Sequence, residues 1–339
     1  MRTGVAAGHV GYFHEAACYD SDEGLLAVVL PFLIGGIEAG EPTLVSLDER
    51  HSELVRSALP ADSGVRFLDG GDVYARPAAA IRSYRQMLAD HVAAGAGQIR
   101  IVGEVPTAAL GSTWDWWARY ESAINHAYDE FPLWSMCVYD RRVTPPPVLA
   151  DVLRTHPRVA LPDGQRLTSE TYTDPLVYLT EPRPMLPDPI QYAPPLVELV
   201  DPTPARARAA VCAADPGHLS PDEVENLVVA VSETVTNALR HGREPVTLRL
   251  WSGPDRIVVS VHDCGEGPKD PFAGLLPAGD GANGGLGLWI THQSCDHVAM
   301  HRGPDGFTIR LTSGNAHLTG SDAPAADMTG LEAAALHPA

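Results

Sequence analysis

Helix-like and strand-like segments alternate along the first half of the chain, from residue 8 to about residue 160. Helices are expected near 22–39, 49–58, 77–95, 113–129 and 146–154. Strands are expected in the runs TLVSL, VRFL, QIRIVGE and LWSMCVYD, at 43–47, 65–68, 98–104 and 133–140. Such alternation predicts an α/β domain with a mainly parallel sheet covered by helices.

The second half has a different order of elements. It predicts a strand at 197–200, a helix from about 203, a long helix at 221–241, a hairpin at 246–263, a helix at 286–294 and a final strand at 306–311. A glycine-rich loop separates the hairpin from the last helix. This grouping predicts an α+β domain in which helices cover one face of an antiparallel sheet.

Proline and turn residues crowd the segment between the two halves, where they block a long helix and mark a connection between domains. We therefore predict an N-terminal domain at 8–160, a Pro-rich linker at 161–195 and a second domain at 196–313. Residues 314–339 are small, polar and rich in alanine without periodicity, which predicts a disordered tail. A length of 339 residues suits two domains.

The long helix at 221–241 has clear ends. Ser220 is placed as an N-cap, followed by proline and, at the third helical position, by the glutamate of a capping box, and Gly242 supplies the stop. Glu233 and Asn237 share one face, one turn apart. A solvated helix face would explain that pair alone. The predicted core stripe at three-and-four spacing is Val224, Leu227, Val228, Val231, Val235, Ala238 and Leu239.

A second motif lies at the end of the hairpin. Asp263 is followed by Gly265 and Gly267, a D-x-G-x-G pattern whose glycines permit close approach of a ligand to the backbone. A simple hairpin turn is the alternative for this motif alone.

A third motif, NGGLGLWITHQ, puts Gly284, Gly285 and Gly287 directly before a helix. Exposed amides and a helix dipole then converge where an anion binds, although a flexible linker has the same composition. The final strand carries Thr308 after Gly-Phe. The three motifs in this order, each at a strand or helix end, indicate a nucleotide site.

Composition narrows the class of protein. The longest apolar run, LLAVVLPFLIGGI at 25–37, is short and interrupted for a membrane span, and MRTGVAAGHVGYFHEA lacks the pattern of a signal peptide, so we expect a cytoplasmic protein. The net charge of -19 argues against nucleic acid or an anionic membrane as the main partner. Five cysteines without CxxC or zinc-ligand spacing indicate reduced thiols.

Residues 197–312 resemble an ATP-binding domain of the GHKL (Bergerat) superfamily, and within it the anti-sigma-factor serine kinases of the RsbW and SpoIIAB type. SETVTNALRHG resembles the N box, DCGEG the G1 box and GGLGLW the G2 box. The resemblance implies ATP and Mg²⁺ as cofactors. It also implies that Asn237 holds Mg²⁺, that Glu233 is the general base and that Asp263 accepts a hydrogen bond from the adenine amine.

The resemblance implies supporting roles for further residues. Gly265 and Gly267 would let the base approach, and Thr308 would support it. The phosphates would lie against Gly285, Leu286, Gly287 and Leu288, with Lys269 and Arg240 as lesser candidates for phosphate contact. The lid PKDPFAGLLPAGDGAN is short and has no obvious catalytic arginine.

The N-terminal half resembles the MEDS sensory domain, a RecA-like or KaiC-like module, in VGYFHEAACYDSDEGLLAVVLPFLIGGIEAGEPTLVSL, RIVGE and CVYD. Residues 1–190 contain no Walker A motif and no lysine, so no second ATPase site is expected there. Ligand-pocket candidates at the carboxyl ends of the strands, each with core packing or a surface role as the alternative, are His9, His14, Tyr12, Cys18, Glu104, Glu121 and Tyr139.

The segment WDWWARYE at 114–121 contains three tryptophans, whose indoles cannot all face one core. Either one indole lies at an interface or both sides of the helix are buried.

The domain pairing resembles actinobacterial RsbA-type anti-sigma regulators. It implies a partner-switching protein that sequesters a sigma factor and phosphorylates a serine or threonine of a STAS-type anti-anti-sigma protein, under control of an unknown small-molecule or protein signal. Family resemblance also suggests a homodimer. The alternatives are a sensor histidine kinase, for which 161–195 supplies no helical hairpin, and a nucleotide-dependent binding module without phosphate transfer.

Overall fold

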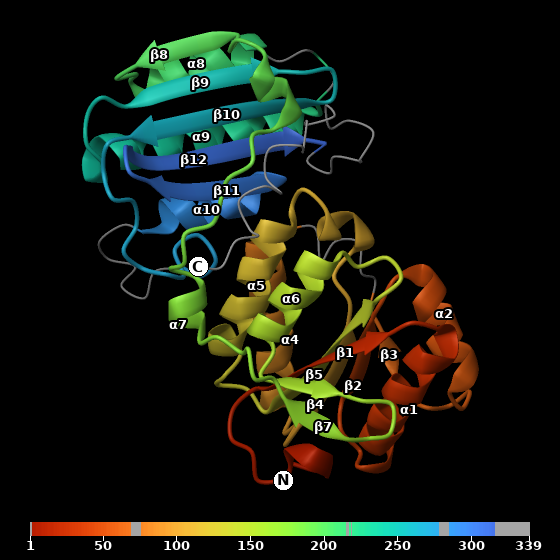
Figure 1. Ribbon diagram of the computed structural model, residues 1–339. Coiled ribbons are helices and arrows are strands. Elements are labelled where there is room, and N and C mark those ends of the chain that lie inside the picture. Colours follow the sequence, from red (N-terminus) through yellow and green to blue (C-terminus); the bar gives the residue numbers. More distant parts are fainter. Residues whose placement is uncertain (1, 69–75, 215–216, 218, 278–284, 316–339) are drawn as a thin grey trace, which may run out of the picture.

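The computed structural model describes residues 2–68, 76–214, 217, 219–277 and 285–315. The chain forms two packed units, each with its own sheet (Figure 1). The N-terminal sheet has seven strands in the order β3-β2-β4-β5-β1-β6-β7, and only the β6–β7 pair is antiparallel. The C-terminal sheet has the order β11-β12-β10-β9-β8 and is antiparallel throughout. Both fold classes are therefore confirmed.

The strands of the first sheet are β1 (Phe13–Tyr19), β2 (Thr43–Ser46), β3 (Arg66–Phe67), β4 (Ile99–Gly103), β5 (Leu133–Asp140), β6 (Arg158–Ala160) and β7 (Arg166–Thr168). Its longer helices are α1 (Asp22–Glu38), α2 (Glu49–Ala58), α4 (Pro77–Ala93), α5 (Trp114–Ala127) and α6 (Pro146–Thr155). Apolar side chains of α1 and α2 form a core on one face of the sheet, and those of α4, α5 and α6 form a core on the other. The sequence did not predict β1, β6 or β7.

The second sheet consists of β8 (Val197–Val200), β9 (Thr247–Ser252), β10 (Arg256–Asp263), β11 (His297–Gly303) and β12 (Gly306–Gly314). Its helices are α8 (Pro204–Ala214), α9 (Pro221–His241) and α10 (Leu286–Ser294). They lie behind one face of the sheet (Figure 1). Strand β11 was not predicted, and β12 extends beyond the predicted end at residue 311.

Residues 161–195 contain more order than a linker requires. Strand β7 extends the N-terminal sheet, and Tyr178 of the short helix α7 (Pro175–Tyr178) is buried in the N-terminal core. The remaining short elements are the 3-10 turns η1 (Gly4–Ala6), η2 (Thr107–Leu110) and η3 (Pro189–Tyr192). Of the predicted tail at 314–339, residues from 316 onward lie outside the described residues.

Buried contacts join the two units. Trp116 of α5 is 1% exposed and packs in the core of the C-terminal unit, where its Nε1–H donates to His292 Nδ1 of α10 at 3.0 Å. Trp114 and Trp117 pack in the N-terminal core instead. Arg76 also bridges the units, with Nη2 2.7 Å from Asp296 Oδ1. The tryptophan cluster is thus divided between a core and an interface.

Within the described residues, no helix is long and apolar enough to cross a membrane.

Candidate functional site

Helix α9 brings the first motif to the site. Ser220 Oγ accepts from the Glu223 amide and the Glu223 carboxylate accepts from the Ser220 amide, so the predicted capping box is present. The buried face consists of Leu227, Ala230, Val231, Thr234, Val235 and Ala238. Leu239, predicted in the core, is 41% exposed, because in the last turn of the helix the buried position is that of Ala238.

Glu233 and Asn237 are half-buried and face the start of α10. A methyl group added at Gly287 would lie 2.7 Å from Glu233 Oε2 and 3.2 Å from Asn237 Nδ2. A side chain at this position would therefore push the Glu233 carboxylate and the Asn237 amide away from the start of α10. The N-box and G2-box residues are thus brought together by the packing of α10 on α9.

Asp263 is the last residue of β10 and is buried. Its two hydrogen bonds from backbone amides go to the same carboxylate oxygen. Oδ1 accepts from the amides of Gly265 at 2.7 Å and Arg243 at 3.2 Å. A methyl group at Gly265 would lie 2.6 Å from the same oxygen, so the glycine is needed here. These bonds fix the carboxylate and leave Oδ2 for a ligand, since no bond to Oδ2 is present among the described residues.

These elements surround a cavity of about 460 Å³. Its lining residues are Thr234, Asn237, Ala238, His241, Gly242, Val261, Asp263, Gly267, Pro268, Lys269, Asp270, Ala273, Leu276, Gly285, Leu288, Phe307 and Ile309. The volume and the mixture of an apolar wall with a few polar groups are typical of small-molecule sites.

Phe307 of β12 forms part of this apolar wall, and Gly267 packs on its ring. Gly267 has φ +71°, and a side chain there would collide with the ring. The sequence analysis missed Phe307. The β10–β12 register would have indicated it, because Phe307 pairs with Asp263.

Thr308 does not line the cavity, contrary to the expectation that it would support the base. Its hydroxyl lies 3.0 Å from His262 Nδ1 and forms a hydrogen bond with it. Successive residues of a strand point to opposite faces, so Phe307 and Ile309 face the cavity and Thr308 does not.

The start of α10 has the geometry of an anion site. Gly285 is the N-cap, with φ +108°, and it lines the cavity together with Leu288. Leu286 does not line the cavity, but as the first residue of α10 it has an amide without an intrahelical acceptor. Free amides at a helix N-terminus favour a phosphate. Gly284 lies outside the described residues.

The first part of the lid closes one side of the cavity with Lys269, Asp270, Ala273 and Leu276. Two apolar lid residues between them, Phe272 and Leu275, are buried in the core of the N-terminal unit. The Phe272 ring stacks on His126 of α5, with ring centroids 4.5 Å apart. The lid is therefore anchored on the N-terminal domain.

Two other predictions about the lid region have different outcomes. Arg240 is exposed and does not line the cavity, whereas Lys269 does. Lid residues 278–283 lie outside the described residues. The described part of the lid, up to residue 277, contains no arginine.

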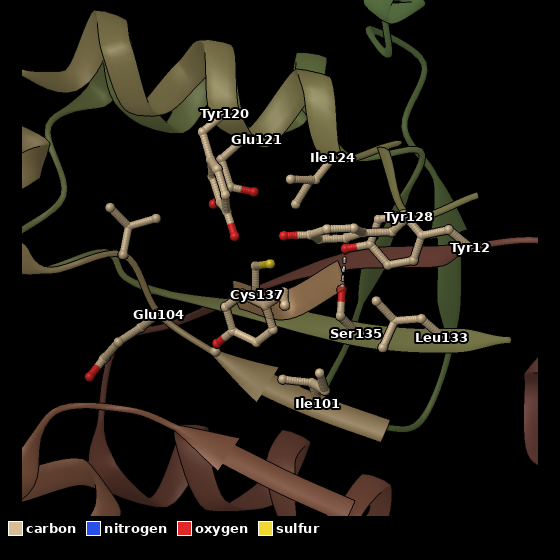
Figure 2. Close-up of a pocket in the computed structure, with 13 residues that line it drawn as sticks. Tyr12, Ile101, Glu104, Tyr120, Glu121, Ile124, Tyr128, Leu133, Ser135 and Cys137 are labelled. Atoms are coloured by element: carbon tan, nitrogen blue, oxygen red, sulfur yellow. Dashed lines mark hydrogen bonds between the residues drawn. The ribbon is translucent and has the colours of Figure 1, made fainter. Parts of the chain in front are cut away.

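A second cavity lies in the N-terminal unit between the sheet and helix α5 (Figure 2). Tyr12, Glu104 and Glu121 line it, together with Cys137 and Ser135. The Tyr12 hydroxyl and Ser135 Oγ share a hydrogen bond at 2.6 Å. The sequence analysis had not singled out Cys137 or Ser135.

The other four candidates adjoin this cavity or lie apart from it. Tyr139 donates to Glu121 Oε1 at 3.1 Å, and His14 Nε2 lies 3.7 Å from Glu121 Oε2. His9 makes a hydrogen bond with the Tyr12 carbonyl. Cys18 is half-buried and does not line the cavity.

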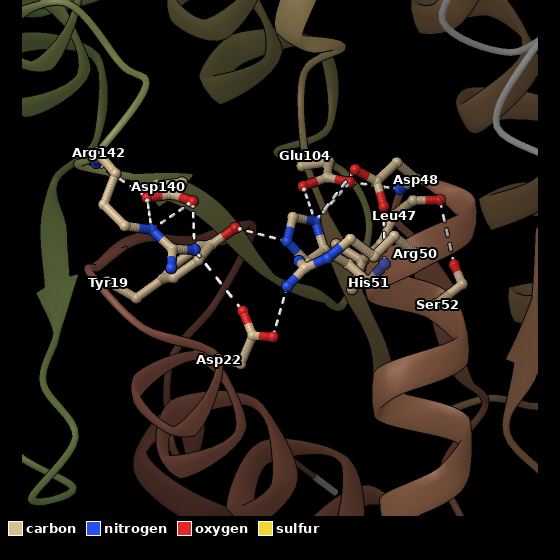
Figure 3. A network of polar contacts seen from close by, with 10 residues as sticks. All are labelled: Tyr19, Asp22, Leu47, Asp48, Arg50, His51, Ser52, Glu104, Asp140 and Arg142. Carbon is tan, nitrogen blue, oxygen red and sulfur yellow. Dashed lines mark hydrogen bonds and ion pairs between the residues drawn. The ribbon is translucent and has the colours of Figure 1, made fainter.

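A polar network covers the carboxyl ends of the same strands (Figure 3). His51 Nδ1 lies 3.1 Å from Glu104 Oε2 and 3.2 Å from Asp48 Oδ2. Arg142 makes an ion pair with Asp140 at 2.6 Å. Burial is the main cause that raises the pKa of Glu104. The side chains of this polar network are paired with one another and partly exposed, which is typical of a solvated sheet edge.

Two family models match the chain and account for the two units. Residues 13–157 match MEDS, the methanogen/methylotroph and DcmR sensory domain. Residues 196–313 match the histidine kinase-like ATPase domain. The chain thus combines a MEDS domain with an ATPase domain of this type, as the resemblance implied.

Curated relatives match part of the chain. The serine-protein kinase RsbW of Bacillus subtilis (strain 168) is 30% identical over 104 residues, and RsbW of Bacillus velezensis is 29% identical over 104 residues. Each match covers 27% of this chain and 64% of the relative. The chain therefore spans less than two thirds of the length of these relatives.

Solved structures are similar over the same part. The RsbU and RsbW domains of a Mycobacterium tuberculosis protein are 19% identical, with a TM-score of 0.26, over 36% of this chain and 32% of theirs. The histidine kinase domain of the Escherichia coli osmosensor EnvZ is 19% identical, with a TM-score of 0.22, over 36% of this chain and 90% of its own.

Proposed function

We propose that the chain is an ATP-dependent protein kinase and anti-sigma factor of a partner-switching system. The single observation that carries the proposal is the convergence of Asn237, Asp263 and Gly285 on one cavity within a histidine kinase-like ATPase domain. The similarity to the serine-protein kinase RsbW supports serine or threonine as the acceptor. The partners are then a sigma factor and a STAS-type anti-anti-sigma protein, with the MEDS domain as the sensor.

The site residues suit ATP. In the proposed complex, Asp263 Oδ2 accepts from the adenine amine, because Oδ1 is already held by two amides. The Phe307 ring and Leu276 supply the apolar wall for the base. The amides after Gly285 bind phosphate oxygens at the start of α10.

The donor set also fits Mg²⁺, which prefers oxygen ligands and is usually held by few protein groups and by phosphates. Asn237 would hold the ion through its amide oxygen, since this side chain lines the cavity beside the start of α10. When bound, Mg²⁺ neutralises charge on the phosphates.

Glu233 is the proposed general base. Its carboxylate would accept the proton of a serine or threonine hydroxyl while the hydroxyl oxygen attacks the γ-phosphorus of ATP and ADP leaves. Positioning of ATP by Asn237 and the α10 amides supplies the larger part of catalysis in such reactions.

One observation favours a second candidate, a nucleotide-dependent binding module without transfer. Glu233 does not line the cavity and lies under Gly287 instead. A histidine kinase has less support, because the described residues of 161–195 form only short elements and His156 is buried at the end of α6. His218 lies outside the described residues.

The test is incubation of the purified full chain with Mg²⁺ and γ-labelled ATP, alone and with STAS-domain proteins. Acid-stable label on a STAS protein is the expected result, and acid-labile label on the chain itself would indicate a histidine kinase. ATP binding without any label would favour the second candidate, a nucleotide-dependent binding module without transfer.

Two variants test the proposed roles of Asn237 in Mg-ATP binding and of Glu233 in phosphate transfer. Asn237→Ala should weaken Mg-ATP binding about 10- to 100-fold, the loss expected for a contact with a charged ligand. Glu233→Gln should retain binding and lose transfer. Glu225→Gln, an exposed glutamate of the same helix, is the matched control and should change neither. Undiminished transfer by Glu233→Gln would remove the base assignment.

A further inference from the structure

Four metal-ligating side chains meet inside the MEDS domain, away from the nucleotide site. They are His14 of β1, Glu121 of α5, Cys137 of β5 and His156, which directly follows α6. One ligand atom of each lies within 4.8 Å of those of all the others. His14 and His156 are 0% exposed and Glu121 is 1% exposed. The cluster is therefore formed by four separate elements and shielded from solvent.

Hydrogen bonds aim both imidazoles at the centre of this cluster. His156 Nδ1 lies 2.8 Å from the Val152 carbonyl, which only accepts, so Nδ1 carries the proton and Nε2 presents a lone pair. His14 Nδ1 lies 3.0 Å from Asn125 Oδ1.

The amide of Asn125 is oriented unambiguously. Its Nδ2 donates to the carbonyls of Glu121, Ser122 and Thr155, so Oδ1 must be the atom that faces His14. His14 Nδ1 is then the donor, and its Nε2 also presents a lone pair. A histidine that ligates a metal typically donates its other ring N–H to such an acceptor.

Two of the four ligand atoms have no hydrogen-bond partner among the described residues. They are Glu121 Oε2 and His156 Nε2, which lie 3.5 Å apart. Buried polar atoms without partners are rare in proteins and indicate a missing ligand.

We propose that His14, Glu121, Cys137 and His156 bind one divalent first-row transition metal ion, with Zn²⁺ as the ion that fits best. Zn²⁺ takes exactly these donor types, a thiolate, imidazole nitrogens and a carboxylate oxygen, in tetrahedral sites. Cys137 binds as the thiolate, so its proton is released on binding.

The spacing of the donor atoms matches this geometry. His14 Nε2 lies 3.4 Å from Cys137 Sγ and 3.7 Å from Glu121 Oε2, and Glu121 Oε2 lies 3.5 Å from His156 Nε2. Tetrahedral Zn²⁺ with its usual bond lengths separates neighbouring donors by about 3.3–3.8 Å. The other three pairs of donor atoms lie within 4.8 Å, so movements of the side chains alone would bring all four donors to one ion.

The proposed site lies at the wall of the N-terminal cavity. Glu121 and Cys137 belong to both, and Figure 2 shows the Cys137 thiol pointing from the sheet toward the helix that carries Glu121. Glu121 is on α5, the helix that also carries Trp116 into the ATPase unit. The ion would thus tie α5 to strands β1 and β5.

The test uses the full chain, freed of metal with a chelator and titrated with Co²⁺ as a spectroscopic probe and with Zn²⁺ in competition. The expected result is one equivalent bound, with a thiolate-to-cobalt charge-transfer band and the intense visible bands of a tetrahedral ion. Absence of stoichiometric uptake would overturn the proposal.

Variants separate a metal site from a polar core. Cys137→Ser should lose the charge-transfer band. His156→Gln should weaken Co²⁺ binding more than about 100-fold, since loss of a residue that only hydrogen-bonds to a metal ligand already lowers metal affinity about 10- to 100-fold. The controls are Cys18→Ser and His51→Gln, a free thiol and a buried histidine of the same domain that pairs with Glu104 and Asp48 instead.

Thermal unfolding checks that the variants fold. Zn²⁺ should raise the Tm of the wild type and of both control variants, because an ion that binds only the folded state stabilises it. It should not raise the Tm of His156→Gln. A Cys137→Ser protein that retains the charge-transfer band would also contradict the proposal.

Discussion

Trp116→Phe tests whether the two units share one buried interface. The substitution retains most of the aromatic packing and removes the Nε1–H that donates to His292 Nδ1. His292 is 0% exposed, so its Nδ1 would lose its partner without gaining water. An unpaired buried acceptor costs about 1–3 kcal/mol in the free energy of unfolding.

The assay is urea unfolding of the full chain, followed by far-ultraviolet circular dichroism. With a urea dependence of about 1–3 kcal/mol per molar, a loss of 2 kcal/mol lowers the midpoint of the affected transition by about 1 M. The affected transition should be that of the ATPase unit, because Trp116 packs in its core.

Trp114→Phe is the matched control on the same helix. Its Nε1–H donates to Asp151 Oδ2 at 3.0 Å, and that carboxylate also accepts from Tyr178 and Arg183. Asp151 keeps these partners in the variant, so the loss should stay below about 1 kcal/mol. Equal losses for the two variants, or none for Trp116→Phe, would refute the shared interface.

Three further predictions follow from the same geometry. Burial, then Arg119 and His297, lower the pKa of His292 to about 3, so as the pH falls the unfolded chain, with a histidine pKa near 6.5, is protonated before the folded one. The contribution of His292 to stability is therefore full above pH 6.5 and should fall by about 2 kcal/mol at pH 5. In urea unfolding at both pH values, His292→Asn should lose less stability between them than the wild type. Gly267→Ala adds about 1–3 kcal/mol of backbone strain at φ +71° and a collision with the Phe307 ring. ATP affinity, measured by calorimetry, should therefore fall at least about tenfold. Phe272→Ala removes the lid anchor, so hydrogen exchange of the lid should accelerate; unchanged exchange would contradict the anchor.

The sequence predicted the elements whose signals are local. Helix α9 has a capping box and an apolar stripe within its own residues, and its observed bounds agree with the prediction. The glycines at 265 and 285 were predicted as sites of close approach, and the structure has tight packing or a left-handed backbone there. The position of Thr308 outside the cavity was not predicted, because it depends on which face of β12 the residue occupies, and that follows from strand register.

Strand β1 escaped prediction because two of its buried residues are polar. His14 and Glu15 interrupt any apolar alternation, yet both are 0% exposed. Glu15 is accommodated by Trp134, whose Nε1–H donates to it at 3.0 Å, and by Arg166 of β7. Partners so distant in sequence leave no local pattern, which is also why the cluster around His14 could not be predicted.

The anchoring of Phe272 and Leu275 in the N-terminal core bears on how such chains evolve. The two family models suggest modules that recombination exchanges freely, each with its own boundaries. Here the lid is encoded with the ATPase module and packs in the core of the other one. A MEDS domain acquired from another gene would have to match this lid in shape, so exchange of either half alone should disturb the packing of Phe272 and Leu275.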